Sequence, residues 1–213
     1  MIAGPNGSGK STLTDQLLAR GVDLGRYINA DLIDASLEGP PGEERSRRAQ
    51  ALADGARREC LDEGISFAFE TVMSHPSKIE VLREARRRGY AVVIFFVALE
   101  SPKLNVERVR QRVALGGHPV PEDRIVARYE RCLALLPEAL RECDRAVLFD
   151  NTYRKRPDAR VQLVPFCEIR RTRNEGEPGF QCLDQRGGTV TMSSLPHWAQ
   201  YPLEQLRGRR PLS

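Results

Sequence analysis

The chain has 213 residues, of which 40% are apolar and 29% are charged, and its formal net charge is +4. This length suits one α/β domain with a substantial core and is short for two domains. No apolar run approaches the roughly 18–20 residues that span a bilayer, and a charge this modest does not by itself indicate nucleic-acid binding.

The first motif is a glycine-rich loop that follows the apolar start Met1–Ala3. Glycines allow backbone N–H groups to wrap a phosphate, and the helix that follows directs its positive end at the same group. In such a loop the lysine reaches the β- and γ-phosphates of ATP, and the serine hydroxyl binds Mg²⁺. The sequence therefore predicts a P-loop of the form G-x-x-x-x-G-K-[ST] that binds ATP and Mg²⁺ through Gly4, Pro5, Asn6, Gly7, Ser8, Gly9, Lys10, Ser11 and Thr12.

The first elements around this loop are short. Because only Met1, Ile2 and Ala3 precede Gly4, we expect either a very short first strand or a start upstream of Met1. A helix is expected at Lys10–Arg20, ended by Gly21, and a short strand at Tyr27–Asn29.

Asp31 directly follows this second strand. In a doubly wound sheet the carboxyl ends of the strands face the ligand crevice, where a carboxylate can accept a proton from a substrate hydroxyl. Asp31 is therefore a candidate catalytic base that contacts the acceptor. The alternative is a helix N-cap, because an apolar stretch follows.

Glu70 is a second strand-end carboxylate. A helix with one apolar face is expected at Glu43–Glu63, and the strand Ser66–Glu70 comes next. At that strand end Glu70 can bind Mg²⁺ through its water or contact the acceptor beside Thr71. The alternative is a helix cap formed with Thr71.

A lid is expected next, after a helix at Ser77–Arg88 and a buried strand at Ala91–Leu99. It spans about residues 103–136 and has two helices, Lys103–Leu115 and Glu122–Leu136. Arg108 and Arg112 share a helix face and are candidate catalytic groups for the phosphoryl group, with a solvated face as the alternative.

His118, in the connecting loop, is either a loop hydrogen-bonding residue or a phosphate ligand. We favour a solvated face for the similar stripe of Arg124, Arg128 and Arg131.

The last core strand is expected at Arg145–Asp150, and the composition changes after it. Strand composition returns at Arg160–Arg170 and Phe180–Ser193, around a turn at Asn174–Gly179. The fold class is α/β, a three-layer P-loop NTPase fold with a mostly parallel sheet, helices on both faces, a helical lid and a C-terminal β-hairpin appendage. We expect a kinase domain at residues 1–152 and a β-rich extension at 153–213 packed on the same domain.

The cysteines and the early position of the loop indicate the compartment. The chain has no CxxC pair and no clustered histidine, so we interpret its cysteines as reduced thiols rather than disulfides or zinc ligands. A phosphate loop this close to Met1 leaves no room for a secretory signal. We therefore expect a cytoplasmic protein, with thiols at Cys60, Cys132, Cys143, Cys167 and Cys182.

Six motifs in this order resemble the zeta-toxin family, and in particular its compact stand-alone branch, often labelled a predicted ABC-type ATPase. The resemblance covers about residues 1–151 and rests on Ala3–Thr12, Asn29–Asp31, Phe67–Thr71, Arg87–Tyr90, Arg108–Pro121 and Phe149–Asn151.

The resemblance implies an ATP-dependent kinase that phosphorylates the 3′-hydroxyl of the amino sugar in UDP-N-acetylglucosamine and related UDP-sugars. It implies that Asp31 is the base, that Glu70 is the family's strand-end glutamate, and that Arg108 or Arg112 is its first lid arginine. Two departures bear on the acceptor and leave ATP binding intact. Where the family has a second lid arginine shortly before a proline, this chain has His118–Pro121. Where the family has an arginine beyond the strand-end glutamate, this chain has Ser74–His75.

We therefore predict a cytoplasmic kinase for a small-molecule acceptor, a UDP-sugar in the first instance, with an antitoxin as the protein partner to test. Neither a membrane nor nucleic acid is expected as a partner. The alternatives are a kinase for nucleotides or nucleic-acid ends, and a non-catalytic module in which ATP orders the lid for a protein partner.

Overall fold

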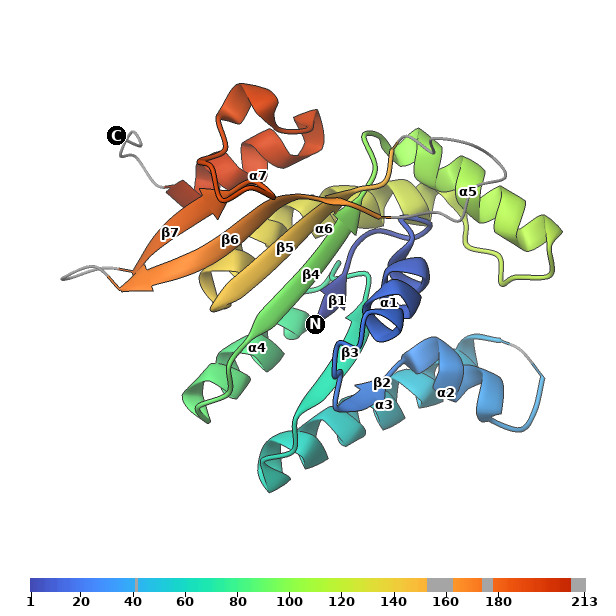
Figure 1. Ribbon diagram of the computed structural model, residues 1–213. Coiled ribbons are helices and arrows are strands. Elements are labelled where there is room, and N and C mark those ends of the chain that lie inside the picture. Colours follow the sequence, from blue (N-terminus) through green and yellow to red (C-terminus); the bar gives the residue numbers. More distant parts are fainter. Residues whose placement is uncertain (41, 153–162, 174–177, 208–213) are drawn as a thin grey trace.

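A single seven-stranded sheet organises the chain (Figure 1). The computed structural model describes residues 1–40, 42–152, 163–173 and 178–207. The strand order is β2-β3-β1-β4-β5-β6-β7. The first five strands in this order are parallel, β6 pairs antiparallel with β5, and β7 pairs antiparallel with β6. The strand bounds are β1 Ile2–Ala3, β2 Arg26–Ile28, β3 Phe67–Thr71, β4 Val93–Ala98, β5 Arg145–Asp150, β6 Pro165–Arg173 and β7 Pro178–Leu183.

The first strand, β1, spans two residues. Ile2 pairs with Glu70 of β3 and Phe95 of β4, and Ala3 pairs with the next residue of each strand. Both side chains of β1 are fully buried. Two residues are sufficient because neighbours on both sides supply the ladder.

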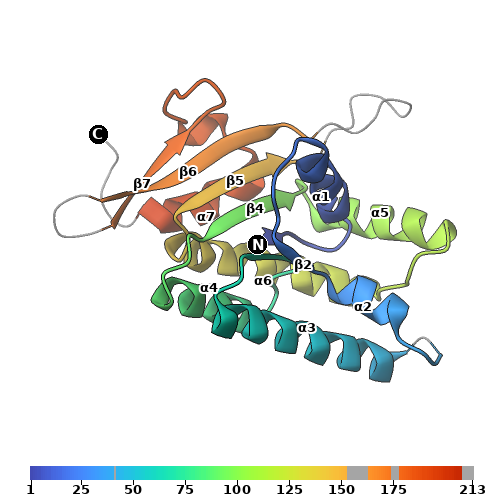
Figure 2. The ribbon, with the colours of Figure 1, turned by 60° about the horizontal axis from the view of Figure 1, so that its bottom comes forward.

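Helices cover both faces of the sheet, as predicted (Figure 2). On one face α1 contributes Leu13 and Leu17 to a small apolar cluster with Ile2 and Val97. On the other face α3, α4, α6 and α7 enclose the main core. The helix bounds are α1 Lys10–Ala19, α2 Ala30–Ser36, α3 Glu43–Glu63, α4 Ser77–Arg87, α5 Pro102–Ala114, α6 Glu122–Arg141 and α7 His197–Arg207.

Three predictions about elements were wrong. Helix α2 was expected only under the alternative in which Asp31 caps a helix, and α6 continues past Leu136 through Pro137 to Arg141. A proline removes one backbone donor, and the buried side chains beyond it, Ala139 and Leu140, keep the helix in place.

The third error concerns the second strand of the hairpin, which ends at Leu183 instead of Ser193. The Asp184 carboxylate accepts hydrogen bonds from the backbone N–H groups of Arg186 and Gly188 and so closes a turn. The chain then reverses, and the N–H of Val190 donates to the carbonyl of Cys182. A short 3₁₀ turn and α7 follow. Residues 160–162 of the expected first strand and 174–177 of the expected turn lie outside the described residues.

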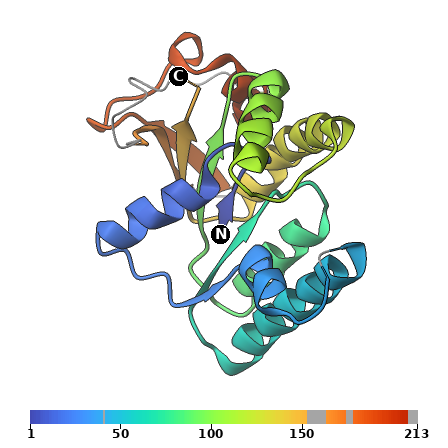
Figure 3. The ribbon, with the colours of Figure 1, turned by 90° about the vertical axis from the view of Figure 1, so that its right-hand side faces the viewer.

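The hairpin β6–β7 extends the sheet itself, because β6 pairs with β5. Helix α7 packs on the same side as α6, and its Trp198 lies against Phe96 of β4 and Phe166 of β6. The carboxyl ends of the parallel strands meet at one edge of the sheet. Figure 3 faces this edge, with α1, α2 and α5 toward the viewer.

Candidate active site

The glycine loop joins β1 to α1 and is closely packed. Gly4 and Gly9 have φ angles of 152° and 103°, which side chains with a β-carbon rarely adopt. A Cβ on Gly4 would collide with the carbonyl oxygen of Val97, and one on Gly9 would lie 2.6 Å from Nδ2 of Asn151. The loop therefore requires glycine at these positions, and its backbone forms the narrow cradle that a phosphate chain fits.

Lys10 lies inside this cradle. Its Nζ donates to the carbonyl oxygens of Gly4 at 3.0 Å and Pro5 at 3.1 Å. Burial lowers the pKa of Lys10, whereas the charges of Glu70 and Asp31 raise it. Lys10, Glu70 and Asp31 therefore lie close enough for their charges to interact.

Glu70 is held at the end of β3 by hydroxyl groups. Its Oε1 accepts hydrogen bonds from Oγ1 of Thr14 and from the hydroxyl of Tyr27, both at 2.6 Å. Its Oε2 lies 3.5 Å from Oγ of Ser11. Across the described ranges no cluster of three or more His, Cys, Asp or Glu side chains could hold a metal. One carboxylate beside one hydroxyl fits Mg²⁺, which usually keeps several water ligands.

Asp31 occupies the second position of α2, and its side chain is exposed to solvent. The N-cap of that helix is Asn29, whose Oδ1 accepts from the N–H of Asp31 at 2.9 Å. The alternative that Asp31 is the cap is therefore wrong, and its carboxylate is available for chemistry.

The capping alternative for Glu70 and Thr71 is also wrong, since α4 begins after Pro76. Oγ1 of Thr71 instead accepts from the N–H of Met73 at 3.0 Å. Thr71, a predicted acceptor contact, therefore lies next to Glu70, and its hydroxyl oxygen is already used by the backbone of Met73.

Helix α5, the first helix of the expected lid, packs directly on the glycine loop. Nδ2 of the fully buried Asn105 donates to the carbonyl of Asn6 at 2.5 Å. A Cβ on Gly7 would lie 2.9 Å from the carbonyl oxygen of Asn105 and 3.2 Å from Cγ2 of Val109. The start of α5 is therefore a fixed wall of the site.

The two lid arginines have different surroundings. Arg108 is partly buried and donates to the carbonyl of Asn151 at 2.7 Å, so it does not belong to a solvated face. Arg112 is exposed and donates to the carbonyl of His118 at 3.0 Å. The charge of Arg112 also lowers the pKa of Lys10, as a smaller cause than burial. Arg110 points away and pairs with Glu122.

Asn151 directly follows β5. From the sequence it was included only in a family motif and was assigned no chemical role. It is buried, and its Nδ2 donates to the carbonyl of Ser8 at 2.8 Å. Because Arg108 binds the backbone of the same residue, Asn151 links the lid to the loop. The sequence feature that could have identified Asn151 as a site residue is its position directly after a buried strand.

Arg128 of α6 was interpreted as part of a solvated stripe, and the structure contradicts this. It is partly buried, and within the described ranges it makes no hydrogen bond or ion pair. Burial lowers the pKa of Arg128, the charges of Arg124 and Arg131 lower it further, and Asp31 raises it. Arg128 is thus a desolvated cation within electrostatic reach of the candidate base.

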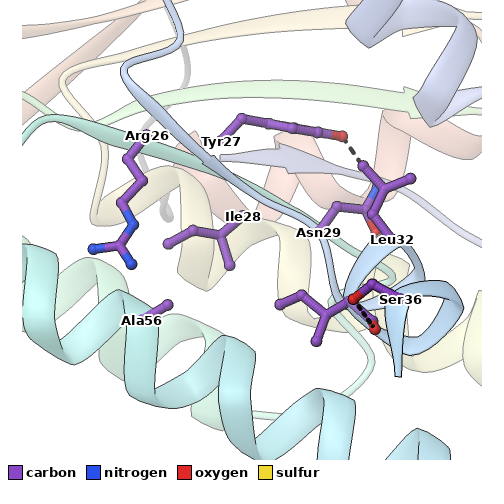
Figure 4. Close-up of a pocket in the computed structure, with 8 residues that line it drawn as sticks. Arg26, Tyr27, Ile28, Asn29, Leu32, Ser36 and Ala56 are labelled. Atoms are coloured by element: carbon purple, nitrogen blue, oxygen red, sulfur yellow. Dashed lines mark hydrogen bonds between the residues drawn. The ribbon is translucent and has the colours of Figure 1, made fainter. Parts of the chain in front are cut away.

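A pocket of about 300 Å³ lies between β2, α2 and α3 (Figure 4). Its walls are mainly apolar, including Ile28, Leu32 and Ala56, and its rim includes Tyr27 and Asn29. The pocket therefore adjoins the helix that carries Asp31.

A sequence model of the zeta toxin family matches residues 40–163, more than half of the chain. The matched segment contains Glu70, the lid and Asn151; the glycine loop and Asp31 precede it. A protein of Haemophilus influenzae is 29% identical over 126 residues, which are 59% of this chain and 88% of that protein.

Two solved structures share the fold. The PezAT toxin–antitoxin system of Streptococcus pneumoniae matches with a TM-score of 0.52 and 13% identity, covering 100% of this chain and 79% of that chain. The complex AvrRxo1-ORF1:-ORF2 with ATP matches with a TM-score of 0.55 and 14% identity, covering 100% of this chain and 64% of that chain. None of the helices in the described ranges is long and apolar enough to cross a membrane.

Proposed function

This chain belongs to the zeta toxin family, and on that premise we propose that it transfers the γ-phosphoryl group of ATP to a hydroxyl group of a small molecule. The family match and the fold support a P-loop kinase. The observation that carries the proposal is the geometry at the carboxyl edge of the sheet, where Lys10 lies in the glycine loop and Glu70 lies beside Ser11 of the same loop.

The glycine loop and Lys10 would hold the phosphates of ATP, and Ser11 and Glu70 would hold Mg²⁺. When bound there, Mg²⁺ would offset negative charge on the β- and γ-phosphates. Asp31 takes the proton of the acceptor hydroxyl as its oxygen bonds to the γ-phosphorus. The bond from that phosphorus to the β–γ bridging oxygen breaks, and ADP leaves.

The lid supplies positive charge as the phosphoryl group transfers. Arg112 lies within electrostatic reach of Lys10, and its bond to the carbonyl of His118 is exposed and readily exchanged. Arg108 sits between the loop and the end of β5, close to its proposed place of action. Both arginines are thus proposed as catalytic groups.

For the acceptor we propose a UDP-activated sugar such as UDP-N-acetylglucosamine, bound near Asp31, Glu70, Thr71 and His118. The departures at Ser74–His75 and His118 remove arginines that could contact a diphosphate. Arg128 supports the proposal, because a partly buried cation without an ion partner in the described ranges suits an anionic ligand.

A protein partner is proposed from the relatives. PezAT is a toxin–antitoxin system, and AvrRxo1-ORF1 is seen with ORF2. We propose that an antitoxin binds this chain and that it acts in the cytoplasm. Neither a membrane nor nucleic acid is proposed as a partner.

The test is an incubation of purified protein with ATP, Mg²⁺ and a panel of UDP-sugars, nucleosides and oligonucleotides, followed by mass spectrometry. We expect a gain of one phosphate on UDP-N-acetylglucosamine or a related UDP-sugar. Lys10→Ala, which removes the cation from the β- and γ-phosphates, should stay folded and form no product. Phosphorylation of oligonucleotides alone would replace the sugar-kinase proposal, and ATP binding without any product would indicate a nucleotide-gated binding module.

A further inference from the structure

A chain of side-chain hydrogen bonds runs from α1 to the start of α2. Thr14 and Tyr27 donate to Oε1 of Glu70, both at 2.6 Å. The Tyr27 hydroxyl accepts from Nδ2 of Asn29 at 3.1 Å, a bond drawn in Figure 4. Oδ1 of Asn29 accepts from the N–H of Asp31 at 2.9 Å. Three successive bonds therefore connect the strand-end glutamate to the helix that carries the candidate base, and a fourth connects the glutamate to α1.

The protons available on Tyr27 and Asn29 set the direction of the bonds between Glu70 and Asp31. The Tyr27 hydroxyl has a single proton, which it gives to Glu70, so its lone pair is available to Asn29. The Asn29 amide uses its NH₂ group on Tyr27 and its carbonyl on Asp31.

The chain limits how Glu70 and α2 can move. With two donors on Oε1, the carboxylate leaves Oε2 on the side of Ser11, 3.5 Å from its hydroxyl. Helix α2 has only 7 residues, too few for a helix that is stable on its own. Its first turn therefore depends on side-chain contacts such as the Asn29 cap.

We propose that Tyr27 and Asn29 are positioning residues that hold the Glu70 carboxylate and the Asp31 helix in one fixed arrangement. This inference rests on the proposed function, in which Glu70 serves the metal and Asp31 takes the acceptor proton. In-line transfer is sensitive to displacements of about 1 Å, which can cost roughly 100-fold in rate. Tyr27 and Asn29 act through Glu70 and Asp31 and need not touch the substrate.

Tyr27→Phe removes the hydroxyl and leaves the ring packed against the cluster around α1. In protein without nucleotide or metal, we expect amide hydrogen exchange at Asp31 to become several-fold faster. By calorimetry, the gain in ATP affinity that Mg²⁺ provides should shrink. Turnover should fall by roughly tenfold or more while the KM for ATP changes little.

Tyr90→Phe is the matched control. The Tyr90 hydroxyl donates to the carbonyls of Cys60 at 2.7 Å and Ile65 at 3.2 Å, at the amino ends of β3 and β4. The same chemical change there should lower thermal stability without altering the exchange at Asp31, the Mg²⁺ effect or turnover. Asn29→Asp is a second probe, because aspartate keeps the cap oxygen but has no proton to donate to Tyr27. It should reproduce the Tyr27→Phe pattern at little cost in stability.

The inference is overturned if Tyr27→Phe and Tyr90→Phe behave alike in exchange and in Mg²⁺ dependence. It is also overturned if Tyr27→Phe slows transfer equally in wild-type and Glu70→Gln backgrounds, because a residue that acts through Glu70 should have little further effect once that carboxylate is replaced. If the wild type transfers phosphate to no acceptor but Tyr27→Phe still changes exchange and the Mg²⁺ effect, the proposed function fails and the positioning role stands.

Discussion

At the residue scale, Asp31 separates two tasks between its backbone and its side chain. The N–H group completes the Asn29 cap, and the carboxylate is exposed. We predict that Asp31→Asn lowers turnover by roughly 10²–10⁴-fold with little change in ATP affinity, because only the proton acceptor is lost. Steady-state kinetics and calorimetry measure the two quantities.

The matched control is Asp15→Asn, an exposed carboxylate on α1, which should leave turnover and stability unchanged. Normal turnover in Asp31→Asn together with a lower melting temperature would assign the Asp31 side chain to helix stability instead of catalysis.

Arg128 gives a second prediction at this scale. Burial and two neighbouring arginines disfavour its charge, so Arg128→Gln should leave the protein at least as stable as the wild type. The KM for an anionic acceptor should rise by roughly tenfold or more, as expected for the loss of a charge-assisted hydrogen bond, while ATP affinity changes little. Arg131→Gln, an exposed member of the same stripe, is the control. Loss of ATP affinity in Arg128→Gln would move this side chain from the acceptor to the nucleotide.

At the element scale, α2 is anchored to α3 by a mostly buried ion pair. Oδ2 of Asp34 accepts from Arg45 at 2.9 Å, and the two side chains are only 12% and 13% exposed. The hydrogen bond from Arg45 is the main cause that lowers the pKa of Asp34 below its ordinary value of 3.8. The ionised carboxylate therefore stabilises the fold above the unfolded-state pKa, and this contribution is lost as the pH falls through the lowered folded-state pKa.

We predict that Asp34→Asn lowers the free energy of unfolding by about 2 kcal/mol at pH 7, the scale of a hydrogen bond to a charged group. The difference from wild type should shrink as the pH falls below 3.8. Urea unfolding at neutral and acidic pH measures it. Glu44→Gln, in an exposed pair with Arg47, should have little effect at either pH. A difference that does not change with pH would contradict the ion-pair explanation.

At the scale of the whole molecule, the C-terminal extension shares the core of the P-loop domain. Trp198 is 4% exposed, and its ring centroid lies 5.7 Å from that of Phe96 and 5.6 Å from that of Phe166. We predict that Trp198→Ala lowers the free energy of unfolding by about 3–5 kcal/mol in one cooperative transition. Circular dichroism is the measurement, since the substitution removes the only tryptophan.

Tyr201→Ala, on the same helix at 63% exposure, should change stability by less than about 0.5 kcal/mol. A separate early transition in Trp198→Ala, with ATP binding retained after it, would show instead that the extension folds independently.

Much of the fold could be predicted because its signals are local. The glycine loop is a contiguous pattern, the buried strands are short apolar runs, and α3 has a long periodic face. Asp31 and Glu70 could be placed at one edge of the sheet, since the carboxyl ends of parallel strands meet there. Local order of this kind is encoded within a few residues of each position.

The short helices could not be predicted in the same way. Neither α2, with 7 residues, nor α7, with 11 residues and an internal proline, is stable without its neighbours. Their stability comes from packing: α2 packs on α3, the next helix along the chain, and α7 packs on α6, which lies far away in the sequence. For the same reason α6 continues through Pro137, where local propensity predicts an end.

The sequence by itself determined the phosphate loop, the parallel sheet and the identity of the two strand-end carboxylates, because each depends on neighbouring residues in the chain. Only the tertiary structure decided how those groups are held. It brought Tyr27 and Asn29 between Glu70 and Asp31, placed Asn151 on the loop and left Arg128 partly buried beside other arginines. Hydrogen bonding, burial and charge proximity across different elements arise only when the chain is folded, and they decide which of many polar side chains act together.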